Sequence, residues 1–242
     1  MIPVIMPPEP ATFDQRCRQR GQTWLAAHPD PADGVTNFWR EFIPDLCRGF
    51  RFRCAYLAML DANGTVDHFL STDHNRHLAY EWSNYRYATG WLNSSKQNVD
   101  DQVLDPFAVR EEWFEVDLAS LHLRLTPAVP ARIRPTAEFT IERLGLNYGR
   151  RTMEIRQHYY TQFRSGAFPL DYLEQIAPLI AVAVRRQQLL DYLALNTEVA
   201  RRDVGNVCGT TQGRGEELAS IWRLAGHIAA VGRGPHVRYR VA

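Results

Sequence analysis

The sequence lacks several features that mark whole classes of protein. No apolar run approaches the about 18 residues of a membrane-spanning helix. The first ten residues, MIPVIMPPEP, contain no basic residue and four prolines, so they do not read as a secretory signal peptide. The four cysteines show no paired spacing, which indicates a reducing compartment. We therefore expect a cytoplasmic protein with no membrane partner.

Lysine is almost absent. Lys96 is the single lysine among 28 basic residues, a bias that a GC-rich genome would explain without any function. The net charge is only +1, which is small for a protein that binds nucleic acid. From 121 to 164, however, eight arginines face three glutamates. Clustered positive charge is what phosphate binding uses, and Arg150 and Arg151 are our candidates for nucleic-acid contacts. For any single arginine, a solvated helix surface is the more common role.

The composition predicts a folded chain of the α+β class, mostly helical. With 242 residues and 45% hydrophobic content, the chain can bury a sizeable core. Periodicity and turn residues predict four regions: N-terminal helices in 1–50, a strand-strand-helix core in 51–110, short strands and Arg-rich helices in 111–196, and a linker with a final helix in 197–242. We expect helices at 13–27, 37–48, 90–97, 134–144, 148–163, 170–195 (with a break at Pro178) and 216–231, and strands at 54–60, 65–69, 85–87, 113–117 and 121–125.

The most informative segment is Val66–Lys96, which reads VDHFLSTDHNRHLAYEWSNYRYATGWLNSSK. Asp67 and His68 close an apolar run, and Asn93 lies on a predicted helix further along. Carboxylate and amide oxygens suit magnesium, which keeps several waters when few side chains hold it. An imidazole beside such an ion can take a proton from water near neutral pH.

Two further residues complete this candidate site. Asn84 follows a Trp-Ser step at the mouth of the second strand, where its side chain can bond backbone across the hairpin and so hold the loop and the His68 ring. Lys96 lies about one helical turn beyond Asn93, and we expect it to reach a phosphate. Taken singly, each residue has a more ordinary reading, such as a turn asparagine or a surface lysine; the joint spacing is the stronger signal.

This spacing resembles the HNH, or ββα-metal, endonuclease motif, and the flanking residues resemble a bacterial subfamily found among restriction and phage-defence nucleases. The flanking likeness rests on Arg53-Cys54-Ala55-Tyr56, Leu78-Ala79-Tyr80-Glu81-Trp82 and Asp105-Pro106-Phe107. A weaker likeness extends from about Pro8 to the segment Thr140–Asn147, so the resemblance covers over half the chain. The resemblance implies a small ββα-metal finger embedded between N-terminal helices and a C-terminal helical region. It also implies cleavage to 5′-phosphate and 3′-hydroxyl ends.

One departure from the family concerns structural zinc. Many members carry two C-x-x-C pairs, whereas here Leu57 takes the second place of the first pair, and Thr89 and Leu92 take the places of the second pair. One thiol cannot make a tetrahedral zinc site. We therefore expect no structural zinc and an apolar plug, with Leu57 and Leu92 packed where the metal would sit.

The sequence thus predicts a metal-dependent endonuclease that acts on DNA, most simply duplex DNA, in anti-phage defence or restriction. Asp67 and Asn93 would hold one divalent ion, magnesium in the first place and manganese as the alternative, while His68 activates water and Asn84 supports it. Two alternatives stay open. The chain could cleave only within a defence complex with an ATPase or another partner, or it could be a non-catalytic nucleic-acid-binding subunit.

Overall fold

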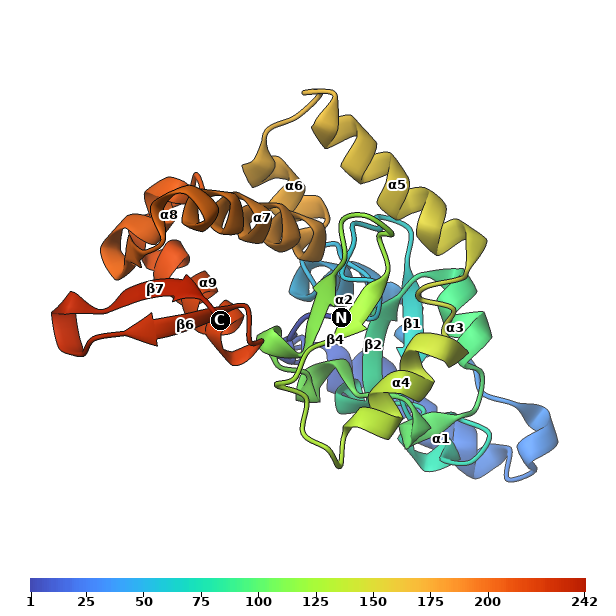
Figure 1. Cartoon of the computed structure of the whole chain (residues 1–242). Helices are drawn as coiled ribbons and strands as arrows, with labels where there is room; N and C mark the ends of the chain where they lie inside the picture. Colours follow the sequence, from blue (N-terminus) through green and yellow to red (C-terminus); the bar gives the residue numbers. More distant parts are fainter. The chain divides into compact units, whose positions relative to one another are not determined.

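The computed structural model describes residues 1–242, apart from the side chain of Pro235. The chain divides into two compact units, which we describe separately. Unit 1 comprises 1–109 and 139–146, and unit 2 comprises 110–138 and 147–242. Helices and small antiparallel sheets alternate along the chain (Figure 1), as expected for a mostly helical α+β protein. Among the described residues, no helix is both long and apolar enough to cross a membrane.

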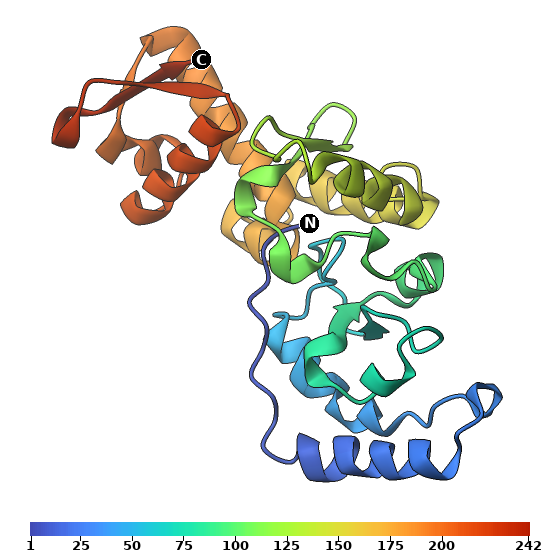
Figure 2. The same cartoon turned by 90° about the horizontal axis from the view of Figure 1, so that it is seen from below.

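Unit 1 begins with an extended arm that leads into a helix (Figure 2). The Trp82 indole donates to the Pro7 carbonyl oxygen at 2.8 Å, which ties the arm to the core. The helix starts with a π-helical stretch, Asp14–Arg18, and continues as α1, Gln19–Ala27. A 3₁₀ segment, Phe38–Phe42, runs into α2, Ile43–Gly49. Both helices match their predicted positions to within one or two residues.

The centre of unit 1 is a hairpin followed by a helix. Strand β1, Thr65–His68, pairs antiparallel with β2, Tyr85–Ala88, and α3, Gly90–Lys96, follows. The order strand, strand, helix agrees with the prediction, and so do the bounds to within a residue. Residues 54–60, in contrast, form no strand: they make a tight turn that an isolated bridge between Arg53 and Leu60 closes.

Aromatic side chains make the core of unit 1. Phe13 packs edge-on against Phe42, Trp82 and Tyr85, at centroid distances of 5.0, 5.2 and 5.8 Å. Such edge-to-face pairs add to the free energy gained by burying their area. Tyr85 comes from β2 and Phe42 from the start of α2, so the N-terminal helices pack on the hairpin rather than forming a separate region. The predicted boundary at residue 50 is therefore not a domain boundary.

Unit 2 opens with a second hairpin and continues with helices. Strand β3, Phe114–Val116, pairs with β4, Leu123–Leu125. Helix α4, Arg134–Arg143, crosses from unit 2 into unit 1, and α5, Arg150–Arg164, follows in unit 2. Helices α6, Leu170–Ile176, and α7, Pro178–Asn196, are separate, which confirms the predicted break because proline cannot continue the preceding helix.

The C-terminal part of unit 2 differs from its prediction. The expected linker at 196–215 contains β5, Val199–Ala200, and α8, Val204–Val207. The last helix, α9, begins at Gln212 and ends at Leu224 rather than near Val231. Strands β6, Ile228–Val231, and β7, Arg238–Val241, follow it and pair in a three-stranded sheet of order β5-β7-β6, which the sequence did not predict.

Candidate functional site

The strand β1 delivers Asp67 and His68 to opposite faces of the hairpin. Side chains alternate along a strand, and directly paired residues share a face. Asp67 pairs with Arg86, whereas His68 pairs with Tyr85. The two adjacent residues therefore enter different surroundings, and the hairpin separates the predicted metal ligand from the predicted base.

His68 lies in an aromatic cluster, and a backbone carbonyl holds its ring. Its Nε2 atom is 2.9 Å from the Ala79 carbonyl oxygen. Trp39 and Tyr85 present ring edges at centroid distances of 4.6 and 5.1 Å. A carbonyl oxygen only accepts hydrogen bonds, so Nε2 carries the hydrogen. In the neutral ring, the lone pair that can take a proton is then on Nδ1.

The surroundings of His68 favour this neutral form. Burial lowers the pKa of the imidazole below its ordinary value of 6.5, and the Lys96 ammonium acts in the same direction. The bond to the Ala79 carbonyl and the charge of Asp67 act against this lowering without cancelling it. At pH 7 the ring is therefore neutral, which is the state that a general base requires.

Asn84 supports the loop that leads to Ala79. Its Oδ1 atom accepts from the Leu70 amide at 2.8 Å, and its Nδ2 atom donates to the carbonyl oxygens of Leu70 and Leu78 at 2.9 and 3.3 Å. The Tyr85 hydroxyl donates to the Ala79 carbonyl oxygen at 2.8 Å, so two donors hold that oxygen. Asn84 thus makes the backbone bonds across the hairpin that its position in the sequence predicted.

Asp67 is buried and fully engaged within the protein. The Tyr56 hydroxyl donates to Oδ2 at 2.5 Å, and the Lys96 Nζ atom lies 3.1 Å from Oδ1. Burial and the neighbouring carboxylate raise the pKa of Tyr56, so its hydroxyl keeps the proton that it donates. Asp67 has a relative exposure of 1% and Lys96 of 0%, and hence the pair is shielded from water.

Lys96 is placed away from the phosphate contact that the sequence predicted. Besides Asp67, its ammonium donates to the carbonyl oxygens of His68 and Phe69, each at 2.9 Å. An ammonium group has three donors, and all three point to atoms of unit 1. The Lys96 ammonium therefore binds groups inside unit 1. It does so because α3 packs beside β1, and the spacing of residues in the sequence does not show this packing.

Asn93 also turns toward β1. Its Nδ2 atom donates to the Val66 carbonyl oxygen at 3.0 Å, so the nitrogen rather than the oxygen of the amide faces the strand. Asn93 and Asp67 do not fit a magnesium ion as they lie, because the ammonium of Lys96 already provides the cation beside Asp67. The described residues contain no group of three or more His, Cys, Asp and Glu side chains suited to a metal. A metal at Asp67 stays a prediction, and it requires Lys96 to withdraw.

The turn that carries Cys54 is compact. Cys54, Leu57, Thr89 and Leu92 are all buried, as the apolar plug requires. The Thr89 amide donates to the Cys54 sulfur at 3.4 Å, and burial raises the pKa of this thiol. Ala58 has a φ of +56°, a left-handed conformation that costs a residue with a Cβ about 1 kcal/mol or more. The backbone hydrogen bonds that close the turn hold Ala58 in this conformation.

Arg150 and Arg151 belong to α5 in unit 2, whereas the His68 site belongs to unit 1. Both arginines are exposed, and Arg150 pairs with Glu154 one turn along the helix at 2.7 Å. Arg156 of the same helix is buried and donates to the Leu121 carbonyl oxygen at 3.1 Å, so its charge is structural. Burial lowers the pKa of Arg156 to about 10.

Sequence reasoning missed the groups that hold the site together. Tyr56 reaches Asp67 from a turn eleven positions earlier, and Trp39 reaches His68 from the start of the second helix. The Ala79 carbonyl belongs to the backbone, so the identity of the residue does not indicate its role. Aromatic residues are common in any core, so neither Tyr56 nor Trp39 carried a signal that could have distinguished it.

Comparisons with known proteins add no match. No family model, no curated protein and no solved structure matches this chain.

Proposed function

We propose that this chain hydrolyses phosphodiester bonds of DNA and that His68 is the base that activates the attacking water. The observation that carries the proposal is the 2.9 Å contact between His68 Nε2 and the Ala79 carbonyl oxygen. This contact leaves the lone pair of a neutral ring on Nδ1. Burial keeps the ring neutral at pH 7 by lowering its pKa.

Two further observations support the proposal. The elements β1, β2 and α3 follow one another in the order that the HNH resemblance implies. Asn84 and Tyr85 hold the loop and the carbonyl oxygen that orient the ring. A base that is held in one orientation loses less entropy at the transition state than a mobile one.

In the proposed step, His68 Nδ1 takes a proton from a water molecule as the water oxygen attacks phosphorus. The bond from phosphorus to the leaving sugar oxygen then breaks, and the departing alkoxide takes a proton from solvent to become a hydroxyl. The imidazolium returns its own proton to solvent. A divalent ion would add Lewis-acid stabilisation of the phosphate charge if it binds. The support for His68 as the base comes from its own hydrogen bond and its burial.

The test is plasmid cleavage by the full chain with magnesium or manganese, and with a chelator. We expect His68→Ala to lower the cleavage rate by about 10²–10⁴-fold, the usual contribution of a general base. His77→Ala is the matched control, because His77 is an exposed histidine of the same loop, and it should cleave at the parent rate.

Circular dichroism and DNA binding in chelator should be unchanged in His68→Ala. A His68→Ala protein that cuts plasmid as fast as the parent would overturn the assignment of His68. Equal cleavage by the parent with magnesium and with chelator would show that the predicted ion takes no part in the reaction.

A second candidate function is a nucleic-acid-binding module without catalysis. This candidate is favoured by the contacts of Asp67, because its carboxylate already binds the Tyr56 hydroxyl and the Lys96 ammonium. If the parent chain binds duplex DNA and cuts no substrate under any of the metals magnesium, manganese, nickel and zinc, this candidate replaces the nuclease.

A further inference from the structure

The C-terminal part of unit 2 forms a helix-turn-helix followed by a hairpin. Helix α8, Val204–Val207, is joined to α9, Gln212–Leu224, by a short turn that contains Gly209. The strands β6 and β7 follow, and β7 pairs with both β6 and β5. Two helices joined by a short glycine-containing turn are a common DNA-binding arrangement. We call the hairpin from Ile228 to Val241 the wing.

Glycines let the two helices approach closely. A Cβ on Gly215 would lie 2.3 Å from the Gly205 amide nitrogen, and a Cβ on Gly205 would lie 2.6 Å from the Thr211 carbonyl oxygen. Gly209 has a φ of +59°, which suits glycine at the end of α8. The positions of these glycines in the sequence therefore allow α8 and α9 to cross closely.

Apolar residues join the wing to these helices. Trp222 and Leu218 of α9 belong to the same buried cluster as Val199, Ile228 and Tyr239 of the three strands. The other members come from α7, from α8 and the residue that follows it, and from α9: they are Leu189, Leu193, Val204, Cys208 and Ala219. One face of the sheet is thus packed against the helices, and the other face is left for solvent or a partner.

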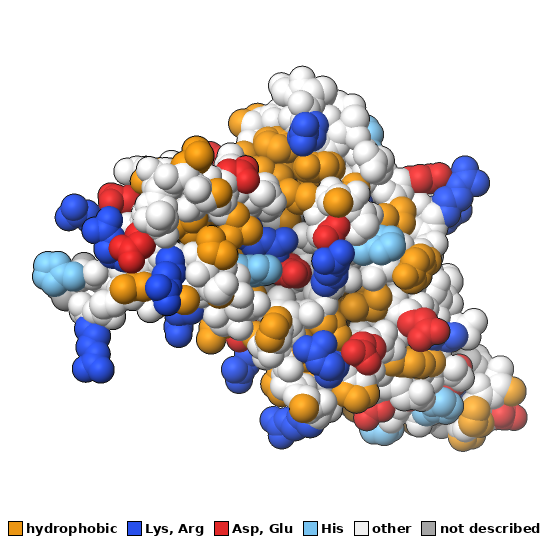
Figure 3. Space-filling view, in the orientation of Figure 1, with side chains coloured by type: hydrophobic (Ala, Val, Ile, Leu, Met, Phe, Trp, Pro, Cys, Tyr) orange, Lys and Arg blue, Asp and Glu red, His pale blue; other side chains and the backbone are white. Residues whose placement is uncertain are grey.

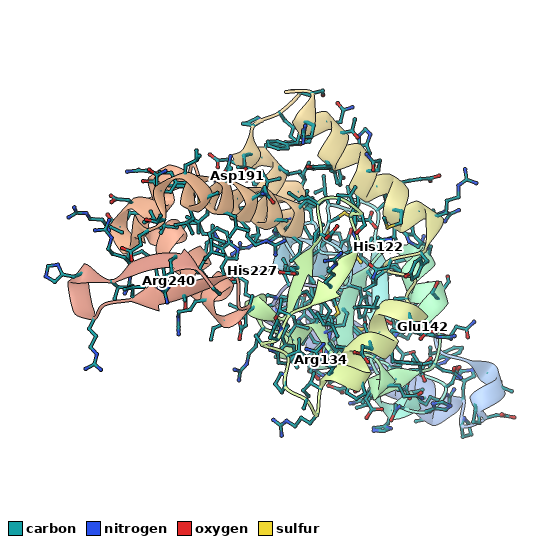
Figure 4. The ribbon with its side chains drawn as sticks, in the orientation of Figure 1. His122, Arg134, Glu142, Asp191, His227 and Arg240 are labelled. Carbon is teal, nitrogen blue, oxygen red and sulfur yellow. The ribbon has the colours of Figure 1, made fainter. Side chains whose placement is uncertain are left out.

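Arginines occupy the open face of the wing. Arg238 and Arg240 alternate with the buried Tyr239 along β7. Ala229 lies opposite Arg240 and Val231 opposite Arg238, so the strand positions paired with the two arginines are apolar. Figure 3 shows basic side chains projecting from this hairpin, and Figure 4 marks Arg240 on it.

The tip of the wing adds Arg233 and His236, and both are exposed. Arg238 pairs with Glu198 at 3.1 Å. Arg233 and Arg240 have no carboxylate of the described residues within ion-pair distance. Guanidinium groups bind phosphate oxygens in a bidentate manner. Their position on a projecting hairpin fits a ligand with a repeated phosphate surface.

The helix α9 is less suited to this role. Its outward face carries Glu216 and Glu217, which pair with Arg201 and Arg214 at 2.7 and 3.1 Å. The helix carries two arginines, Arg214 and Arg223, against these two glutamates, so α9 offers no net positive charge to a groove lined by phosphates. The charge distribution therefore favours the wing, rather than α9, as the surface that binds phosphates.

We propose that the wing is a second binding site, which holds the phosphate backbone of duplex DNA through Arg233 and Arg240. Such contacts position a protein on DNA without reading its sequence. The site goes beyond the proposed nuclease function, because it concerns binding alone and would serve a non-catalytic module as well.

The test measures binding of the full chain to a short labelled DNA duplex by fluorescence anisotropy, in chelator and over a range of salt. The variant is Arg233→Gln/Arg240→Gln. We expect at least about tenfold weaker binding at low salt, and a slope of log K against log salt that falls by about two, because each lost phosphate contact removes about 0.9.

The matched control is Arg16→Gln/Arg48→Gln, which neutralises two exposed helix arginines of unit 1. It should keep the parent affinity and slope. An equal loss in the control, an unchanged slope in the wing variant, or tighter binding of the parent to duplex RNA than to DNA would each overturn the proposal. The assay contains no active metal, so its outcome is independent of His68 and of cleavage.

Discussion

The β1–β2–α3 region of unit 1 and the helix-turn-helix with its wing in unit 2 are both small sheets with helices, yet different forces hold them. The first is built around buried polar groups: Asp67 and Lys96 form an ion pair inside the protein. The second is built around close backbone contact between Gly205 and Gly215 and an apolar cluster. The two regions should therefore respond to different substitutions, and the predictions below test this difference.

The largest effect on stability should come from Lys96→Met. Removing the ammonium leaves the Asp67 carboxylate buried without its cation, and breaking such a pair costs about 3–5 kcal/mol. We expect this loss in the free energy of unfolding, measured by urea denaturation. The double variant Asp67→Asn/Lys96→Met removes both charges and should recover a large part of it. If the single variant is as stable as the parent, the ion pair does not stabilise the β1–β2–α3 region.

An intermediate effect should come from Gly215→Ala. The added Cβ would meet the Gly205 backbone at 2.3 and 2.4 Å, so α8 and α9 must separate. Overpacking of this kind costs about 1–3 kcal/mol.

The matched control is Gly213→Ala in the same helix, where a Cβ meets nothing within 4 Å. This change should leave the protein as stable as the parent or up to about 1 kcal/mol more stable, because alanine favours helix. Thermal unfolding measures both. Equal Tm values for the two variants would show that the glycine contact is not tight in solution.

The smallest effect should be the pH dependence of cleavage. Burial lowers the pKa of His68 below 6.5. The imidazole therefore becomes protonated, and stops acting as a base, only at a pH below that of an ordinary histidine. The rate should therefore stay level on going from pH 8 to about 6.5, the ordinary histidine pKa, and fall on the acid side below it. A stopped-time assay across pH measures this. A rate that already halves above pH 6.5 would contradict the lowered pKa.

The lowered pKa of His68 should also make the β1–β2–α3 region less stable at acid pH. The folded pKa of His68 lies below the unfolded one, so its contribution is fully present above pH 6.5 and is lost as pH falls toward the folded value. His68→Gln should flatten this part of the unfolding profile, which ties the kinetic result to the same group.

Sequence reasoning placed most elements of unit 1 correctly, because local signals mark them. Alternation and the turn Asp61–Gly64 delimit β1, and Gly90 opens α3 at its predicted start. It misread residues 196–215, where polar and glycine-rich residues predicted a linker, and it placed the end of the last helix near Val231 rather than at Leu224. Glycine there marks the α8–α9 crossing, and this contact joins positions ten residues apart.

The sequence by itself determined the types of residue available and the order of strands and helices around Asp67, His68 and Asn84. Only the tertiary structure decided where each side chain goes. Strand alternation sends Asp67 and His68 to opposite faces, and α3 brings Lys96 to Asp67. The Ala79 carbonyl selects the tautomer of His68. These outcomes depend on contacts between residues distant in the chain, whose burial and pairing no local pattern records.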